Sequence, residues 1–452
     1  MRQRPRAAFG GSELAQSRST SRSARPVYIV DGTRTPFLKF RGGPNPFSAA
    51  DLGVEAARQL LLRQPFEPGD LDQVIFGCAG PAADEANVAR VIALRAGCGH
   101  AVPAWHVQRN CGSGMQAVDA ALHDIQDGRS ELVLAGGTEA MSRAPLMFDE
   151  RFVAWLADFQ KARGAVAKAR QLARLRPGWL KPVIALLRGL TDPVSGLSMG
   201  QTAENLAWRF GISRREMDTY AHDSHQRLAA AQDEQRLIEL EPLFGTDGRA
   251  YTADDGLRRE SSVDDLGRLR PVFEKPFGKV TAGNSAQVTD GACALLLASE
   301  EAVSRHDLPV LARIVDSEWA GVDPAEMGLG PVHAVTPMLR RHRMALGSVN
   351  YWELNEAFAA QVLACLAAWR DRRYCREQLG LSKAWGTIDH ERLNVDGGGI
   401  SLGHPVGTSG ARITLHLAHV LRRAGARRGV ATQCIGGGQG GAMLIENPEA
   451  AS

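Results

Sequence analysis

The sequence predicts an α/β fold with two halves of similar plan, separated by a stretch of different composition. Apolar strand-like runs alternate with helical periodicity near the N-terminus, and the same plan returns near the C-terminus. Residues 151–274 differ from both in composition. At 452 residues the chain exceeds one ordinary hydrophobic core, so we expect two or three domains.

The first half alternates strands and helices. "PVYIVDG" (26–32) and "DQVIFGCAG" (72–80) are typical of buried strands, and a helix is predicted between them over residues 48–63. A second helix is expected to end at Gly128, before an apolar strand "ELVLAGG" (131–137). Its apolar stripe consists of Met115, Val118, Leu122 and Ile125.

The last part of the chain repeats this plan. "GHPVGTSGAR" (403–412) begins a predicted helix that ends at Gly425, and the strand "GVATQC" (429–434) follows. The helix has one apolar face, made of Ile413, Leu417, Val420 and Leu421. We therefore expect the two halves to be an internal duplication.

The middle stretch contains a basic amphipathic segment, residues 161–190, with eight basic residues and no acid. One interpretation is a solvated helical lid with an ordinary packing face. A membrane surface, a partner subunit or the phosphates of a nucleotide-bearing substrate are alternative contacts for it.

Composition excludes several classes of function. The net charge of +3 is modest and its basic surplus is local, so we expect no nucleic-acid partner. Seven cysteines are scattered without metal-type spacing, which predicts a reducing compartment and no metal site. The chain has no apolar run of about 18 residues, and residues 1–25 lack a secretory core. That Arg- and Ser-rich extension is expected to be a disordered tail, or else an organellar transit peptide.

One cysteine has a distinctive setting. In "RNCGSGMQAVDAA", Cys111 directly precedes a predicted helix, where unpaired N–H groups and the helix dipole favour a thiolate. Small neighbours leave room for a substrate carbonyl and free amides for a developing oxyanion. Taken alone, the pattern fits a buried, inert cysteine at least as well.

Three further stretches strengthen the catalytic interpretation. "NEAFAAQ" contains Asn355, "GHP" contains His404 among glycines, and "CIGGG" contains Cys434 at a strand end. A nucleophile, an imidazole, a second thiol and an amide suit carbon–carbon chemistry next to a thioester. The structural alternatives are a helix cap for Asn355, a turn for His404 and a core position for Cys434.

These four motifs, in this order, resemble the thiolase family, which makes or cleaves β-ketoacyl-CoA. Three longer stretches are similar to the family as well, so the resemblance covers residues 26–447. They read "GGTEAMSRAP", "PFGKVTAGNSAQVTDGA" and "NVDGGGISLGHPVGTSGAR".

The resemblance implies a thiolase fold with layers in the order αβαβα and a loop domain over the CoA. Its expected parts are an N-terminal half at 26–150 completed by 275–300, the loop domain at 151–274 and a C-terminal half at 301–452. Acyl-CoA and CoA are expected as substrates, with no bound cofactor. A homodimer or tetramer is implied by the resemblance alone.

The resemblance also implies roles for the site residues. Cys111, activated by His404, would form an acyl-enzyme, and Cys434 would exchange the proton on the acetyl-CoA carbon. His404 and a water held by Asn355 would form one oxyanion site, and the backbone N–H groups of Cys111 and Gly436 the other.

Substrate preference follows from departures within the family. Ser198-Met199 and Ser285-Ala286 stand where acetoacetyl-CoA thiolases have His-Met and Ala-Ser, which weakens the short-chain alternative. With Phe358, these residues are the expected substrate contacts. "SMGQTAENLA" and "MDTYAHDSHQRLAAAQ" look more like the thiolase subunit of the fatty-acid oxidation complex.

That likeness favours β-oxidation and a hydratase–dehydrogenase partner, although that subunit type usually has His in place of Asn355. Location is expected to be the bacterial cytoplasm, or the mitochondrial matrix if residues 1–25 are a transit peptide. Two alternatives are a ketoacyl synthase, against which Cys434 argues, and an inactive lipid-binding relative, against which all four motifs argue.

Overall fold

The first half of the chain forms one part of a central β-sheet. The computed structural model describes residues 25–246 and 248–450, so the predicted extension lies outside the described residues except for Arg25. The elements are β1 (Val27–Arg34), β2 (Leu38–Lys39), α1 (Ala49–Leu61), β3 (Gln73–Gly77), α2 (Val88–Arg95), β4 (Ala104–Val107), α3 (Ser113–Gln126), β5 (Leu132–Ala140) and β10 (Thr289–Ser299). The strands lie in the order β1-β10-β5-β3-β4, and β2 pairs with β10.

The second half repeats this arrangement. Its elements are β11 (Ala312–Gly321), α11 (Gly330–Arg341), β12 (Tyr351–Leu354), α12 (Ala359–Arg370), α13 (Arg372–Leu379), α14 (Gly399–Leu402), α15 (Ser409–Arg423), β13 (Arg428–Ile435) and β14 (Gln439–Glu446). Its strands lie in the order β11-β14-β13-β12. In each half the last strand runs antiparallel between the first strand and a parallel pair. The predicted duplication is therefore present at the level of topology.

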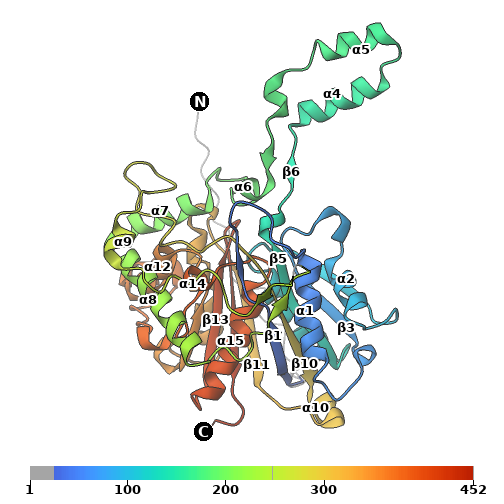
Figure 1. Cartoon of the computed structure of the whole chain (residues 1–452). Coiled ribbons are helices and arrows are strands. Elements are labelled where there is room, and N and C mark those ends of the chain that lie inside the picture. The colour runs from blue at the N-terminus through green and yellow to red at the C-terminus, as the bar shows by residue number, and fades with distance from the viewer. Residues whose placement is uncertain (1–24, 247, 451–452) are drawn as a thin grey trace, which may run out of the picture.

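The two halves stack as layers, with α3 and α15 between the strands of the first half and those of the second (Figure 1). Helices α1 and α2 cover the outer face of the first half, and α11 and α12 cover the second. Strands β1 and β11 pair at Val27–Ile314, which joins the halves into one sheet. This αβαβα order is the predicted fold class.

The central layer explains why α3 and α15 are apolar. Met115 and Val118 of α3 pack with Ile413 and Leu417 of α15, and all four are fully buried. At about 25 cal/mol per Å² of apolar surface removed from water, each such buried side chain stabilises the folded state by about 1.5–3 kcal/mol. The helical spacing in the sequence therefore marks packing faces.

The connection between β5 and β10, residues 141–288, has two parts of different character. Helices α7 (Met199–Arg209), α8 (Arg214–Asp233) and α9 (Val263–Gly267) pack on the body beside the strand pair β8 (Leu243–Phe244) and β9 (Ala250–Tyr251). The remainder projects away from the body (Figure 1). It comprises β6 (Leu146–Met147), α4 (Glu150–Lys161), α5 (Ala165–Leu172), β7 (Val183–Ile184) and α6 (Ala185–Gly189).

For residues 161–190, one of the interpretations above is a solvated helical lid with an ordinary packing face. None of the residues 142–191 is buried, so their apolar side chains are not covered by the body. Helical periodicity indicated an apolar face here but did not indicate what it contacts. Within the described ranges, no helix has both the length and the apolar character needed to cross a membrane.

Candidate active site

The site is built on two equivalent helix starts. Cys111 lies just before α3, and His404 lies in the loop that leads into α15, its counterpart in the second half. The helices cross at Gly114 and Gly410: a Cβ on Gly114 would lie 2.7 Å from Gly407 O, and one on Gly410 would lie 2.6 Å from Met115 N. Glycine is required at both positions because the backbones touch. The duplication thus brings the cysteine loop and the histidine loop together.

Cys111 sits on a constrained backbone. Its neighbour Asn110 has φ +45°, which is uncommon for a residue with a side chain. Asn110 donates from Nδ2 to Gly436 O at 2.8 Å, and Ser113 Oγ donates to Asn110 O at 2.6 Å. These bonds fix the cysteine against the turn that follows β13.

The pKa of the Cys111 thiol is raised from its ordinary value, mainly because the group is desolvated. The backbone N–H groups of Gly436 and of Cys111 itself act in the opposite direction and lower the pKa. The predicted preference for a thiolate is wrong in direction: α3 begins only at Ser113, and desolvation outweighs the amides. Deprotonation of Cys111 therefore needs a base.

His404 has the properties of that base. Burial, assisted by the positive charge of Arg412, lowers the pKa of the imidazole to about 4, so it is neutral near pH 7. Its Nδ1 lies 2.6 Å from Ser409 Oγ, and that hydroxyl donates its only proton to Pro405 O at 3.1 Å. Ser409 must then accept from Nδ1–H, which leaves the lone pair on Nε2.

Asn355 lies beside the imidazole, directly after β12. Its backbone N–H donates to Thr432 O at 2.9 Å, and Nδ2 lies 3.4 Å from His404 Nε2. Oδ1 is buried and accepts no hydrogen bond within residues 25–246 and 248–450. A buried amide oxygen without a partner is suited to a water or a polar substrate group. Asn355 therefore extends the polar part of the site from the imidazole.

Glu356, next in the chain, is structural. Its carboxylate accepts hydrogen bonds from Tyr220, at 2.9 Å, and Ser224, at 2.7 Å, on α8. It also accepts from Asn394 Nδ2 and Ile400 N of the glycine-rich loop before α15. Glu356 thereby ties α8 and that loop to the end of β12.

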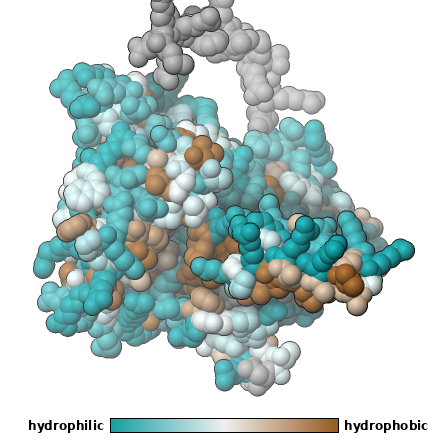
Figure 2. All heavy atoms as spheres, turned by 90° about the horizontal axis from the view of Figure 1, so that it is seen from above, coloured by the Kyte–Doolittle hydropathy of each residue, from teal (hydrophilic) through white to brown (hydrophobic). Residues whose placement is uncertain are grey.

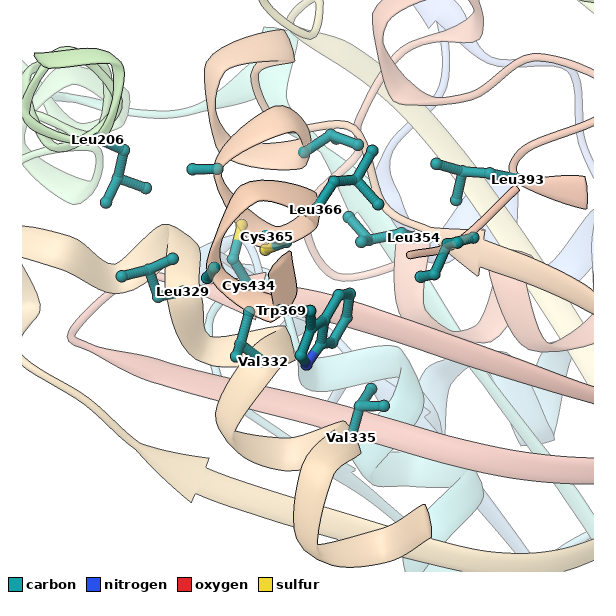
Figure 3. Packing of buried hydrophobic residues seen from close by; sticks show 14 of the residues in the cluster. Leu206, Leu329, Val332, Val335, Leu354, Cys365, Leu366, Trp369, Leu393 and Cys434 are labelled. Carbon is teal, nitrogen blue, oxygen red and sulfur yellow. The ribbon is translucent and has the colours of Figure 1, made fainter. Parts of the chain in front are cut away.

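Cys434 ends β13 at the border of an apolar core. Figure 3 shows it among Leu329, Val332 and Cys365. This burial, with Cys111 and Cys365 nearby, raises the pKa of the Cys434 thiol well above its ordinary value. Cys434 therefore carries its proton near neutral pH, in contrast to His404.

The residues expected to contact the substrate lie in two places, beside Gly436 and beside the chain that follows Asn355. A Cβ on Gly436 would lie 3.1 Å from Met199 Sδ. Ser285 pairs with Phe358 as a β-bridge, and Ala286 N donates to Ala357 O at 2.9 Å. Two serine hydroxyls expected there have other partners: Ser198 caps α7, and Ser285 Oγ donates to Thr281 O.

One residue of the site was missed by the motif analysis. Glu139, at the end of β5, is buried and accepts from the N–H groups of Ala79, Gly80 and Gly407 at 2.8–3.0 Å. It ties the histidine loop of one half to the first half. The signal was a carboxylate at the end of a buried strand, in "GGTEAMSRAP".

The other five cysteines have no assigned role, although Cys365 lies near Cys434 (Figure 3). They are buried and form no disulfide: Cys78, Cys98, Cys293, Cys365 and Cys375. Among the residues that the structure describes, no three His, Cys, Asp or Glu side chains cluster as a metal site would require. The site thus consists of two thiols, an imidazole, an amide and backbone donors.

Comparison with known proteins identifies one family along the whole described fold. Residues 27–301 match the family profile "Thiolase, N-terminal domain", and residues 308–447 match "Thiolase, C-terminal domain". The chain is 39% identical to a beta-ketoadipyl-CoA thiolase of Pseudomonas aeruginosa, over 94% of this chain and 99% of that protein. It is 38% identical to the human mitochondrial 3-ketoacyl-CoA thiolase, over 94% of this chain and 98% of that protein.

Solved structures agree. The crystal structure of human mitochondrial 3-ketoacyl-CoA thiolase in complex with CoA matches with a TM-score of 0.80 at 37% identity, covering 94% of this chain and 98% of that chain. The acetyl-CoA acetyltransferase of Bacillus anthracis matches with a TM-score of 0.81 at 36% identity, covering 94% and 100%.

Proposed function

Because the chain belongs to the thiolase family and is an acyl-CoA C-acyltransferase, we propose that it cleaves 3-ketoacyl-CoA with CoA, in fatty-acid β-oxidation. The products are acetyl-CoA and an acyl-CoA shortened by two carbons. The observation that carries this proposal is that the Cys111 and His404 loops meet where α3 and α15 cross, with Cys434 close to Cys111. Cleavage needs both a base for the nucleophile and an acid for the leaving carbon.

The first step forms an acyl-enzyme. His404 Nε2 takes the proton of Cys111, and the sulfur attacks the keto carbon. The bond between the α and β carbons then breaks, and its electron pair passes to the acetyl-CoA fragment as an enolate. The N–H groups of Cys111 and Gly436, which both act on the thiol sulfur, support an oxyanion site for the tetrahedral intermediate.

Cys434 then protonates the enolate carbon. Its raised thiol pKa supports this role, since an acid must hold its proton until the carbanion forms. His404 and Asn355, with its unpartnered Oδ1, support stabilisation of the enolate oxygen through a bound water. The CoA thiol finally attacks the acyl-enzyme and releases Cys111.

A second substrate class is favoured by one observation. The relatives named beta-ketoadipyl-CoA thiolase match as well as those named 3-ketoacyl-CoA thiolase, at 39% and 38% identity. A substrate with a carboxylate-ended acyl chain, as in aromatic catabolism, is therefore the alternative to a fatty acyl chain. The short-chain alternative, acetoacetyl-CoA, is less well supported because Ser198 and Ala286 replace the His and Ser expected for it.

We also propose a homodimer or tetramer. The edge strand β4 leaves one side unpaired, and Trp105 on it is 39% exposed, which supports a contact there. A hydratase–dehydrogenase partner stays a proposal. So does the location, in the bacterial cytoplasm or, if residues 1–25 are a transit peptide, in the mitochondrial matrix.

Substrate class is tested by CoA-dependent cleavage of three compounds by the purified protein. We expect the highest kcat/KM for a long-chain 3-ketoacyl-CoA, compared with acetoacetyl-CoA and 3-oxoadipyl-CoA. Preference for 3-oxoadipyl-CoA would replace the β-oxidation role by the alternative, and cleavage of none of them would contradict the proposed reaction.

Variants of Cys111 and Cys434 distinguish the roles proposed for the two cysteines. Cys111→Ala is expected to form no acyl-enzyme. Cys434→Ala should still accept an acyl group from a simple acyl-CoA but lose carbon–carbon cleavage by about 100-fold or more. Mass spectrometry of the acylated protein measures the first step, and thiolysis measures both. Equal loss of both steps in the two variants would contradict the assigned roles.

A further inference from the structure

A part of the molecule that the reaction does not use is the projecting arm, defined here as residues 145–190. It leaves the body between β5 and α7 and has α4 and α5 at its tip (Figure 1). No residue of the arm is buried, although it contains regular helices and strands. It is therefore an ordered element without a core of its own.

Contacts within the arm explain its order. Strands β6 and β7 pair as a stalk, with Leu146 opposite Ile184. Along α4 the rings of Phe152, Trp155 and Phe159 follow one another with centroids 5.4–5.6 Å apart. Trp155 Nε1 donates to Gln171 O at 2.7 Å, which joins α4 to the end of α5.

Apolar side chains remain on its surface. Phe148, Val153, Leu172 and Leu187 are each between 53% and 60% exposed, and Val166 is 72% exposed. In Figure 2 the arm lies toward the viewer, and its hydrophilic and hydrophobic residues gather on opposite edges. A continuous apolar edge on an element without a core indicates a surface that another molecule or a membrane covers.

The charge of the arm indicates what covers this apolar edge. Residues 145–190 contain nine basic and three acidic residues, a net charge of +6, whereas the whole chain carries +3. Of the nine, Arg151 pairs with Asp149, and the other eight form no ion pair in the described ranges. These eight are Lys161, Arg163, Lys168, Arg170, Arg174, Arg176, Lys181 and Arg188.

We propose that the arm binds the surface of a lipid bilayer that contains anionic lipids. Basic residues on one edge and aromatic and aliphatic residues on the other are the composition of an element that lies at the headgroup boundary. The helices have 12 and eight residues, far fewer than the roughly 20 needed to span a bilayer, so the contact is peripheral.

The same observations disfavour two other occupants. In a symmetric contact between copies, two arms that each carry +6 would face each other and repel. A partner protein with one groove would need the apolar residues in one place. They extend instead from Leu146 and Leu187 at the stalk to Val153 and Val166 on the helices at the tip.

The experiment is co-sedimentation of the full-length protein with vesicles of phosphatidylcholine alone or with added phosphatidylglycerol. We expect binding to the anionic vesicles, at least tenfold weaker binding to the neutral ones, and release as salt is raised. Binding to neither vesicle, or equal binding to both, would overturn the proposal.

A matched pair of variants locates the contact. In the first, Lys161, Arg163, Lys168 and Arg170 are replaced by Gln; in the control, Arg268, Arg372, Arg373 and Arg376, exposed on the body, are replaced by Gln. The arm variant should bind anionic vesicles about 100-fold more weakly or worse, and the control only slightly more weakly. Equal loss in both variants would refute a role for the arm.

A third variant, Val153→Ser with Leu156→Ser, tests the apolar edge, and we expect weaker binding that salt releases more readily. Unchanged thiolysis checks the folding of every variant, because no arm residue belongs to the catalytic site. Light scattering measures the mass of each: if the arm variants change oligomeric state instead of vesicle binding, the arm is an interface between copies and the proposal fails.

Discussion

Ser409 determines which nitrogen of His404 is free to act as the proposed base. Its hydroxyl accepts from Nδ1–H at 2.6 Å while donating to Pro405 O, so Nε2 is the nitrogen left free. Removing this acceptor lets the imidazole change tautomer or rotate, without removing any group that touches the substrate. Ser409 is therefore a positioning residue.

We expect Ser409→Ala to slow acyl-enzyme formation by about 10- to 100-fold, less than the loss from removing a general base altogether. In the wild type the acylation rate should stay flat from pH 8 down to about 5, because His404, with a pKa of about 4, remains neutral there. In Ser409→Ala the acid limb should move. Stopped-flow acylation across pH measures both, and an unchanged rate and profile would contradict this role.

The control for that variant is Ser130→Ala. Ser130 is also buried, and its hydroxyl accepts from Gln73 Nε2 at 3.0 Å, far from the imidazole in the chain and on another element. It should lose a similar amount of stability with no effect on the acylation rate.

At this scale the sequence marked candidate site residues but did not predict the directions of their pKa shifts. Motifs around Cys111, Asn355, His404 and Cys434 mark the candidates without a structure. The direction of each pKa shift depends on desolvation by residues distant in the chain, which local patterns do not contain. Glu139 was missed for the same reason, since its partners lie in two loops far apart in the chain.

Among the elements, the crossing of α3 and α15 controls how closely the two reacting loops approach. Gly410→Ala would place a Cβ 2.6 Å from both Met115 N and Gln433 Nε2. We expect the helices to move apart, at a cost of about 1–3 kcal/mol in the free energy of unfolding, with a fall in kcat. Urea denaturation and thiolysis measure the two effects.

Gly347→Ala is the matched control for the crossing. Nothing lies within 4 Å of its added Cβ, so stability and kcat should stay unchanged. If Gly410→Ala behaves in the same way, the close approach of the two helices is not required for activity.

Prediction of the elements succeeded where a periodic face meets a core. The helix predicted to end at Gly128 is α3, which ends at Gln126, and the helix predicted to end at Gly425 is α15, which ends at Arg423. For residues 161–190 the basic amphipathic pattern was evident, but the direction in which the arm projects was not. Helical periodicity indicates that one face of a helix is apolar. The direction in which the arm projects depends instead on the stalk β6–β7.

At the scale of the whole molecule, buried ion pairs join three distant parts of the chain. Glu239 contacts both Arg34 of β1 and His416 of α15. His416 lies 2.9 Å from Glu239 and 3.2 Å from Asp396, and all three are buried. Although burial opposes the charge, these carboxylates raise the pKa of His416 from 6.5 to about 10. The histidine is therefore protonated at neutral pH.

This raised pKa predicts a pH dependence of stability. Because the folded state holds the proton more tightly than the unfolded state, the stabilisation is complete below about pH 6.5 and is lost as pH rises towards 10. We expect His416→Gln to be less stable at pH 7 and to have a flatter curve between pH 7 and 9.5. Denaturation midpoints across this range test it, and parallel curves would contradict the assignment.

The duplicated plan of the fold was visible in the sequence because both halves place a glycine-rich loop before an apolar helix and strand. The pairing of β1 with β11 was not, since it depends on which sheet edges meet. Strand order followed only from the coordinates.

The two halves also differ in where they tolerate insertions. The link between β5 and β10 contains the arm and three packed helices, whereas the equivalent link between β13 and β14 is the turn Gly436–Gly438. Any lengthening of that turn would displace the Gly436 N–H from Cys111, so extra sequence can accumulate at only one of two equivalent joints. In such a duplicated architecture, one copy is free to acquire new surfaces while its twin preserves the chemistry.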